Sequence, residues 1–473
     1  MKKNNDQPSL RLISLIEKYD LFTNQHGECY ISIDLNNKTQ IWPLDSNQLK
    51  DWLLFKHYET FGNAASSSAL NDALAVAHGR ARFQSPEIYT NNRFGQNAAY
   101  YLDLATPEWQ SIKMSPGEWT INKDSSSCFI RTSSMRPLPL PTNGGDLSTF
   151  KQFLNIPSQD DFLLVLAYLL ECMRPDTPFP ILLIDGEQGS AKSTTQKYIK
   201  SIIDPSSMTL RVAPNSIQDI FVAARNDYIV SYNNLSDLSA KEQDAICCLS
   251  TGGGYSKRKL FTDMDESMTD IKRPTILNGI GSIASASDFL DRCILLQLPM
   301  IDSTTRKSEL FMQEEFQQAH PSLLGALLDL FVNSLAILPS IKLKETPRMS
   351  DFARLGSAMC IALGQPESKF IQIYNENQNK GNQECIEANP TALSILNLLD
   401  RGKRESIECN FIQLLNTLKR NEPDTTVLPK NPRSLASALK RSAPALRRTG
   451  IQIYFDPTRR SNGYNVTITD ERE

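Results

Sequence analysis

The sequence predicts a mixed α/β protein with a parallel sheet at its centre. Three observations support this fold class: a glycine-rich turn that directly follows a buried apolar run, further apolar strands that alternate with helical segments up to residue 300, and helical periodicity after that point. A chain of 473 residues is too long for a single core and suggests about three domains. Hydrophobic residues make up 40% and charged residues 22%, as in globular proteins.

Changes of pattern along the chain suggest four segments. They are an α+β module over residues 1–145, a core with the parallel sheet over 146–300, a helical lid or connector over 301–385, and a basic winged-helix-like module over 386–473. The first boundary follows the proline-rich run Met135–Pro141, because proline at every second position cannot continue a helix or a central strand. The predicted helices are Ser68–His78, Asp160–Met173, Arg306–His320, Leu323–Leu338 and Asp351–Leu363, and a polar stretch near Asn375–Gln383 leads into the last segment.

The glycine-rich turn is the strongest chemical signal in the chain. It lies between the apolar run Phe179–Ile184 and a helix-compatible segment, so that backbone N–H groups and the positive end of a helix dipole converge where a triphosphate can bind. Lys192 would reach the outer phosphates, and the Ser193 hydroxyl would take one coordination position on Mg²⁺. The residues expected to contact the nucleotide here are Gly186, Gln188, Gly189, Ser190, Ala191, Lys192, Ser193 and Thr194.

One position of this turn departs from the phosphate-loop pattern G-x-x-x-x-G-K-[ST], because Ala191 replaces the second glycine. Alanine can hold helical dihedrals at the first turn of a helix, so we expect the loop to keep its shape. The alternative is a surface turn that matches the pattern by chance. The buried strand before the turn and the helix after it argue against that alternative.

Polar residues that could complete a nucleotide site follow the next two predicted strands. The strand beginning at Asp227 ends in Asn233 and Asn234, where a nucleotide hydrolase needs a carboxylate to organise the metal and its water. The following strand ends in Asn278, which could orient the attacking water or sense the γ-phosphate. Arg292 opens a further strand and could reach the nucleotide of a neighbouring subunit.

These blocks, in this order, resemble a known family. The blocks Gly186–Thr194, Asn233–Ser236, Thr251–Gly254, Pro274–Ile280 and Asp288–Arg292 are similar to those of AAA+ ATPases of the superfamily 3 helicase type, as in phage and mobile-element primase-helicases and related bacterial ATP-binding proteins. The resemblance implies an AAA+ P-loop core, ATP and Mg²⁺ as cofactors, and a homo-oligomeric ring of six subunits with DNA in its channel. It further implies that Asn278 is the sensor, that Arg292 is the finger, and that Arg348 is a lid arginine contacting phosphate in cis.

Two positions closest to the metal depart from the family pattern. Asn233 stands where the family has an aspartate, and Ala191 stands where it has a glycine. A metal shell that lacks a carboxylate usually binds or turns over less well, so ATP binding is better supported than hydrolysis. The nearest other carboxylates are Asp185, Asp227 and Asp237, and none occupies the expected position.

Two regions carry basic residues that could contact DNA. The first is the run Lys257, Arg258 and Lys259 beside three glycines, which suits a hairpin that follows a phosphate backbone, although these side chains could equally face a neighbouring subunit. The second is the last module, where residues 426–465 hold eight basic residues and one acidic residue. Its winged-helix-like pattern nominates Lys440, Arg441, Arg447, Arg448, Arg459 and Arg460 for DNA, whereas pairing with an acidic part of the same ring is the alternative.

Several function classes remain open, and others are not favoured. The first candidate is an ATP-driven helicase or translocase of a mobile element; the second is a nucleotide-gated assembly or clamp with little hydrolysis, in phage defence or replication control, with a protein effector. A DNA-binding regulator with a relic nucleotide fold is a third. Nine cysteines and four histidines show no metal-ligand spacing. We expect no membrane partner and a cytoplasmic location, since no apolar stretch of about 20 residues is evident.

Overall fold

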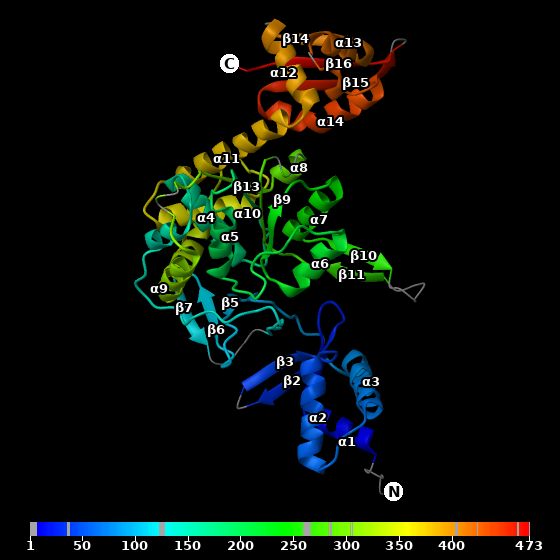
Figure 1. The fold of residues 1–473 in the computed structure, drawn as a ribbon, viewed down its shortest axis with the longest axis vertical. Helices are drawn as coiled ribbons and strands as arrows, with labels where there is room; N and C mark the ends of the chain where they lie inside the picture. Colours follow the sequence, from blue (N-terminus) through cyan, green and yellow to red (C-terminus); the bar gives the residue numbers. More distant parts are fainter. Residues whose placement is uncertain are drawn as a thin grey trace.

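The computed structural model describes residues 7–35, 38–122, 128–258, 266–281, 283, 286–302, 304, 306–402, 405–422, 424–460 and 463–472. Of residues 254–258, 266–270, 401–402, 459–460 and 463 it describes the backbone alone. These parts form three lobes in a row, with the two chain ends at opposite ends of the molecule (Figure 1).

The N-terminal lobe is a small α+β unit. It contains the helices α1 (Pro8–Ile16), α2 (Asn47–Phe61) and α3 (Ser67–Gln84) and the strands β1 (Asp20–Thr23), β2 (Cys29–Leu35) and β3 (Lys38–Pro43). The strands form an antiparallel sheet in the order β1-β2-β3. Ser46 and Ser66 cap α2 and α3 by accepting hydrogen bonds from backbone N–H groups of the first turn. The buried apolar side chains of this lobe form a core of their own.

A second antiparallel sheet follows and packs on the central lobe. Its strands are β4 (Phe94–Asn97), β5 (Ala99–Asp103), β6 (Ser111–Ser115) and β7 (Glu118–Asn122). Phe94 and Leu102 belong to the same hydrophobic cluster as the helices of the central lobe. The fully buried Arg93 donates a hydrogen bond to Asp204 at 3.0 Å. The hydrophobic cores therefore separate before β4, whereas the sequence pattern suggested a first module that continues to residue 145.

The central lobe is built around a four-stranded parallel sheet, as the sequence predicts. Its order is β13-β8-β12-β9, so β12 is inserted between β8 and β9. The strands are β8 (Ile181–Gly186), β9 (Val230–Leu235), β12 (Thr275–Gly279) and β13 (Cys293–Leu298). The helices of this lobe up to β13 are η1 (Leu147–Phe153), α4 (Gln159–Cys172), α5 (Lys192–Ser201), α6 (Ile217–Asn226), α7 (Ala240–Thr251) and α8 (Ser287–Leu290). A hairpin of β10 (Gly254–Arg258) and β11 (Glu266–Asp270) projects from this lobe (Figure 1).

Helix α9 (Glu309–Ile337) differs in two ways from what the sequence led us to expect. It is one continuous helix containing Pro321, where two helices were expected, and it runs on into η2 (Leu338–Ser340). In addition, Glu309–Ser340 is long and apolar enough to cross a membrane by length and composition, although no such stretch was expected. Of its most apolar window, 61% is buried inside the protein, so packing in the core accounts for this composition.

The C-terminal lobe is reached through the long helix α11 (Figure 1). The helices α10 (Ser350–Ala362) and α11 (Glu367–Glu387) precede it, and the stretch 375–383, expected to lead out of the helical region, lies inside α11. The lobe itself contains α12 (Pro390–Gly402), β14 (Ser406–Asn410), α13 (Phe411–Asn421), η3 (Thr425–Val427), α14 (Pro432–Arg448), β15 (Ile451–Arg460) and β16 (Gly463–Asp470). A helix pair followed by a two-stranded wing, with β14 added to the sheet, is the arrangement of a winged helix.

Candidate nucleotide-binding site

The glycine-rich turn lies between β8 and α5, as the sequence predicts. Gly189 has φ +89°, a conformation that favours glycine. A Cβ atom on Gly186 would lie 2.7 Å from the carbonyl oxygen of Leu298 on the neighbouring strand. Both glycines are therefore required by the backbone. Ser190 is fully buried and closes the turn, since its Oγ donates a hydrogen bond to the carbonyl oxygen of Glu187 at 2.8 Å.

Ala191 does not adopt the conformation expected from the sequence. It is the N-cap of α5, with φ 56° and ψ 32°, which is the left-handed region and not the right-handed helical region. An L-residue pays roughly 1–2 kcal/mol for this conformation because its Cβ approaches a carbonyl oxygen. The loop keeps its course, but the missing glycine leaves strain at this position.

The N-terminus of α5 offers free backbone donors. No side chain caps this ten-residue helix, whereas α4, α6 and α7 each begin with a serine that accepts a hydrogen bond. Its first N–H groups and its dipole therefore face the turn, an arrangement that suits an anion. Lys192 lies beside them, and its Nζ donates to the carbonyl oxygens of Gly186 at 2.5 Å and Glu187 at 2.9 Å. Partial burial lowers the pKa of Lys192, and nearby Asp185 opposes that shift.

The polar residues predicted on three different elements meet at the carboxyl edge of the sheet. Ser193 Oγ on α5 donates to Asn233 Oδ1 on β9 at 2.6 Å, and Asn278 Nδ2 on β12 donates to the same oxygen at 2.7 Å. The backbone N–H of Asn234 donates to Asn278 Oδ1 at 2.8 Å. Asn278 Nδ2 also donates a hydrogen bond to the side chain of Gln196. Gln196 is fully buried, and no sequence motif pointed to it. Ser193, Asn233 and Asn278 thus form one network.

Asp227, one of the other carboxylates that the sequence offers, does not lie in this network. Asp227 is buried at the other end of β9 and pairs with Arg211 at 2.8 Å and Lys200 at 3.5 Å. Among the described residues, no group of three or more His, Cys, Asp or Glu side chains could hold a metal ion. The Ser193 hydroxyl and the Asn233 amide oxygen are adjacent, and they fit a Mg²⁺ that keeps most of its water and takes further oxygens from phosphate.

Two further residues touch the turn without any signal in the sequence. Asn155 Nδ2 donates to the carbonyl oxygen of Ser190 at 2.9 Å, and a Cβ on Gly189 would lie 2.7 Å from Nη2 of Arg306. Arg306 therefore brings a second cation next to the loop. Of the remaining predicted contacts, Gln188 is exposed and Thr194 lies half-buried in the first turn of α5.

The predicted finger lies at the opposite edge of the sheet from the turn. Arg292 immediately precedes β13, and β13 pairs with β8 so that Cys293 lies opposite Ile181 and Leu298 opposite Gly186. The Arg292 guanidinium pairs with Asp288 on α8, and its Nε is buried without a hydrogen-bond partner among the described residues. The two arginines flanking Asp288 lower the pKa of this carboxyl.

Arg348, predicted as a lid arginine that contacts phosphate in cis, lies beside the predicted finger. It pairs with the same Asp288 that binds Arg292, and it lies 3.8 Å from Asp291. The reason is that α10 packs against α4 and α9 in the core, which holds the preceding segment at this edge of the sheet. The structure thus brings the two predicted arginines together and away from the phosphate loop of their own chain.

Of the residues nominated for DNA, Arg448 is engaged within the chain. It pairs with Asp291 and also donates a hydrogen bond to Asn382 at 3.1 Å. For this residue, pairing with a carboxylate, which was the alternative to binding DNA, occurs within a single chain. Arg447 donates to the carbonyl oxygen of Ile453 at 2.9 Å. Lys440 and Arg441 are exposed on α14. The side chains of Lys257, Arg258, Arg459 and Arg460, and the whole of Lys259, lie outside the described residues.

The chain is similar to proteins of known structure over most of its length. Two solved structures align with most of it: "SCCmec type IV Cch - active helicase", with a TM-score of 0.48, 15% identity and coverage of 96% of this chain and 92% of that chain, and "The A form apo structure of NrS-1 C terminal region-CTR", with a TM-score of 0.40, 12% identity and coverage of 98% and 99%. No curated protein matches the sequence.

Family models give the clearer result. Residues 148–370 match the model of the actinomycete integrative conjugative element replication protein, AICE_RepA. Residues 391–473 match the model of the AICE RepA C-terminal domain. The two models are parts of one kind of protein, and together they cover well over half of the chain. The chain belongs to the AICE RepA family, the replication proteins of actinomycete integrative conjugative elements.

Proposed function

We propose that this replication protein binds ATP with Mg²⁺ at the N-terminus of α5 and acts on DNA as a helicase-like ring. The observation that carries the proposal is the meeting of Ser193, Asn233 and Asn278 beside an uncapped helix N-terminus. Lys192 binds the outer phosphates, and the Ser193 hydroxyl supplies a metal ligand. When bound, Mg²⁺ neutralises charge on the phosphate oxygens.

A neighbouring subunit completes this proposed site. Arg292 lies at the sheet edge opposite the phosphate loop, so it can serve only the nucleotide of another copy. Its guanidinium then stabilises charge that develops on the transferred phosphoryl group. This requirement supports a closed homo-oligomer, for which the resemblance to superfamily 3 helicases suggests six subunits. Lys440 and Arg441, exposed on the winged helix, are proposed to contact DNA phosphates.

The first test removes the phosphate-binding cation. Lys192→Ala is expected to weaken binding of a fluorescent ATP analogue by at least about 100-fold, because one charge-assisted contact of this kind is worth several kcal/mol. The matched control is Lys197→Ala, five residues later on the same helix. Equal affinity in Lys192→Ala and in the unchanged protein would refute the proposed site. If light scattering shows that the same variant no longer assembles, this result would support nucleotide-dependent ring formation.

A second function is favoured by one specific observation, the amide at position 233. Since Asn233 accepts hydrogen bonds from both Ser193 and Asn278 without adding negative charge, the site could hold ATP with little hydrolysis and act as a clamp on DNA.

Asn233→Asp separates the two candidates. A carboxylate beside Ser193 should lower the Mg²⁺ concentration needed for phosphate release and raise its rate by about tenfold in a clamp, with little gain in a motor that already turns over. The matched control is the neighbouring Asn234→Asp. Phosphate release should be measured with and without DNA, because DNA-stimulated turnover in the unchanged protein supports the motor.

A further inference from the structure

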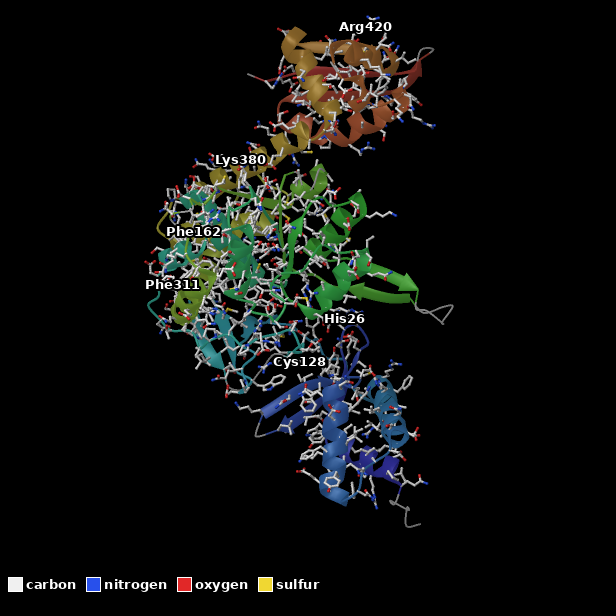
Figure 2. The ribbon with its side chains drawn as sticks, viewed as in Figure 1. His26, Cys128, Phe162, Phe311, Lys380 and Arg420 are labelled. Carbon is white, nitrogen blue, oxygen red and sulfur yellow. The ribbon has the colours of Figure 1, made fainter. Side chains whose placement is uncertain are left out.

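A large groove separates the N-terminal lobe from the central lobe. Its volume is about 1320 Å³, and it is lined by residues from both lobes, including His26, which Figure 2 labels at their junction. Pockets for small molecules measure about 300–1,000 Å³. The groove is therefore large enough for a segment of polymer.

The lining of this groove is polar and carries more positive than negative charge. Four cationic side chains and two carboxylates line it. Arg225 is exposed on α6, and Arg273 follows β11. Arg273 donates to the carbonyl oxygens of Ala224 at 2.9 Å and Lys272 at 3.0 Å and forms no ion pair with any described residue. Its charge is thus not neutralised by a carboxylate, unlike that of Arg131, which pairs with Asp103.

The two carboxylates are already engaged by neutral donors. Glu28 accepts hydrogen bonds from Asn24 Nδ2 at 3.0 Å and from the Tyr30 hydroxyl at 2.8 Å. Asp176 accepts one from the Tyr100 hydroxyl at 3.0 Å. In a chain with a net charge of −3, a groove with surplus cations is a local exception that favours a polyanion.

Aromatic rings and amides add a second kind of contact. The ring of Tyr89 lines the groove and is 67% exposed. Eight asparagine and glutamine side chains also line the groove. An exposed ring can stack on an unpaired base, and amides can bond to base edges. Stacking of this kind is not available to the bases inside an intact duplex, because each base face is covered by the next base.

The position of the groove links it to the projecting hairpin. Thr251 and Gly252, just before β10, and Ile271, Lys272 and Arg273, just after β11, all line the groove. A strand of DNA that follows the hairpin would therefore enter the groove at the hairpin's base.

We propose that this groove binds single-stranded DNA, with Arg225 and Arg273 contacting phosphates and Tyr89 stacking on a base. The N-terminal lobe, for which neither the sequence motifs nor the family models assign a role, then guides a separated strand away from the central lobe. The site does not depend on the nucleotide-binding turn, which lies at the carboxyl edge of the central sheet.

The test measures binding of fluorescein-labelled (dT)15 to the full chain without nucleotide, by fluorescence anisotropy. Tyr89→Ala should weaken binding by about tenfold, as expected for the loss of one base–aromatic stack. The matched control is Phe83→Ala, an aromatic side chain on α3 that is 87% exposed and does not line the groove. Its affinity should equal that of the unchanged protein.

The phosphate contact has its own readout. Arg225→Ala should reduce the slope of log affinity against log salt concentration by about 0.7, the value for one phosphate contact with a single strand. Arg82→Ala, which changes an exposed residue of α3 outside the groove, should leave the slope unchanged. Unchanged affinity in Tyr89→Ala together with an unchanged slope in Arg225→Ala would overturn the proposal and would leave the groove to a protein partner. Equal losses in the control variants would also overturn it.

Discussion

The two edges of the central sheet differ in the chemistry they present. At the carboxyl edge, beside the glycine-rich turn and its cations Lys192 and Arg306, neutral side chains form one hydrogen-bonded network: Ser193, Gln196, Asn233 and Asn278. The amino edge gathers charges: Arg292, Arg348 and Arg448 with Asp288 and Asp291. The six residues of β13 separate the two by about 20 Å, at about 3.3 Å per residue. Under the function proposed above, the two edges are the two halves of one site, and a second copy of the chain would bring them together.

The largest expected effect comes from removing the finger. Arg292→Ala should slow phosphate release by about 10³-fold while ATP affinity stays unchanged, because an arginine finger stabilises charge that appears only in the transition state. The decisive measurement mixes the Arg292→Ala and Lys192→Ala proteins. The first keeps Lys192 and the second keeps Arg292, so together they can form a complete site. A mixture no more active than its two components would break the comparison between the edges. Arg420→Ala, on the exposed face of α13 in the C-terminal lobe, serves as control.

A smaller effect is expected at Arg348, which shares Asp288 with Arg292. Arg348→Ala should slow phosphate release by about 10²-fold and leave ATP affinity unchanged if Arg348, like Arg292, serves the nucleotide of a neighbouring copy. A lid arginine in cis would instead lose ATP affinity. Titration of the variant with a fluorescent ATP analogue therefore distinguishes the two edges directly.

The smallest expected effect concerns strain at the carboxyl edge. Ala191→Gly should raise the free energy of unfolding by about 1 kcal/mol, because glycine adopts φ 56° without the steric cost that alanine pays. Urea unfolding followed by tryptophan fluorescence measures the change. Ala438→Gly, inside α14, should have the opposite sign, since glycine in a right-handed helix costs about 1 kcal/mol. A loss of stability in Ala191→Gly would mean that the left-handed turn is not strained.

The sequence predicted the features that depend on local pattern. The turn at Gly186–Thr194, the parallel strands and the helix-then-wing order of the last module all follow from apolar periodicity and glycine positions. The conformation of Ala191 could not be predicted in this way, because tertiary packing of β8 against β13 sets the path of the turn. The residue type alone does not reveal that the backbone at this position must adopt the left-handed conformation.

Long-range packing decides the features that the sequence did not reveal. Arg348 and Arg448 lie 56 and 156 residues after Arg292, yet all three meet at α8 and the residues that follow it. No spacing rule connects them, since ion pairs form wherever helices bring charges together. Likewise, Pro321 suggests a break between two helices, but α9 continues through it within the packed core.

The pairing of Arg448 with Asp291 has a mechanical consequence. Helix α8 has only four residues; Asp288 within it pairs with Arg292, and Asp291 directly after it pairs with Arg448 in the last turn of α14. A charge-assisted hydrogen bond acts only near 3 Å, so a shift of α14 by a few ångströms must either break this pair or pull α8 along. A movement of the C-terminal lobe would therefore be passed through α8 to the ion pair between Asp288 and Arg292.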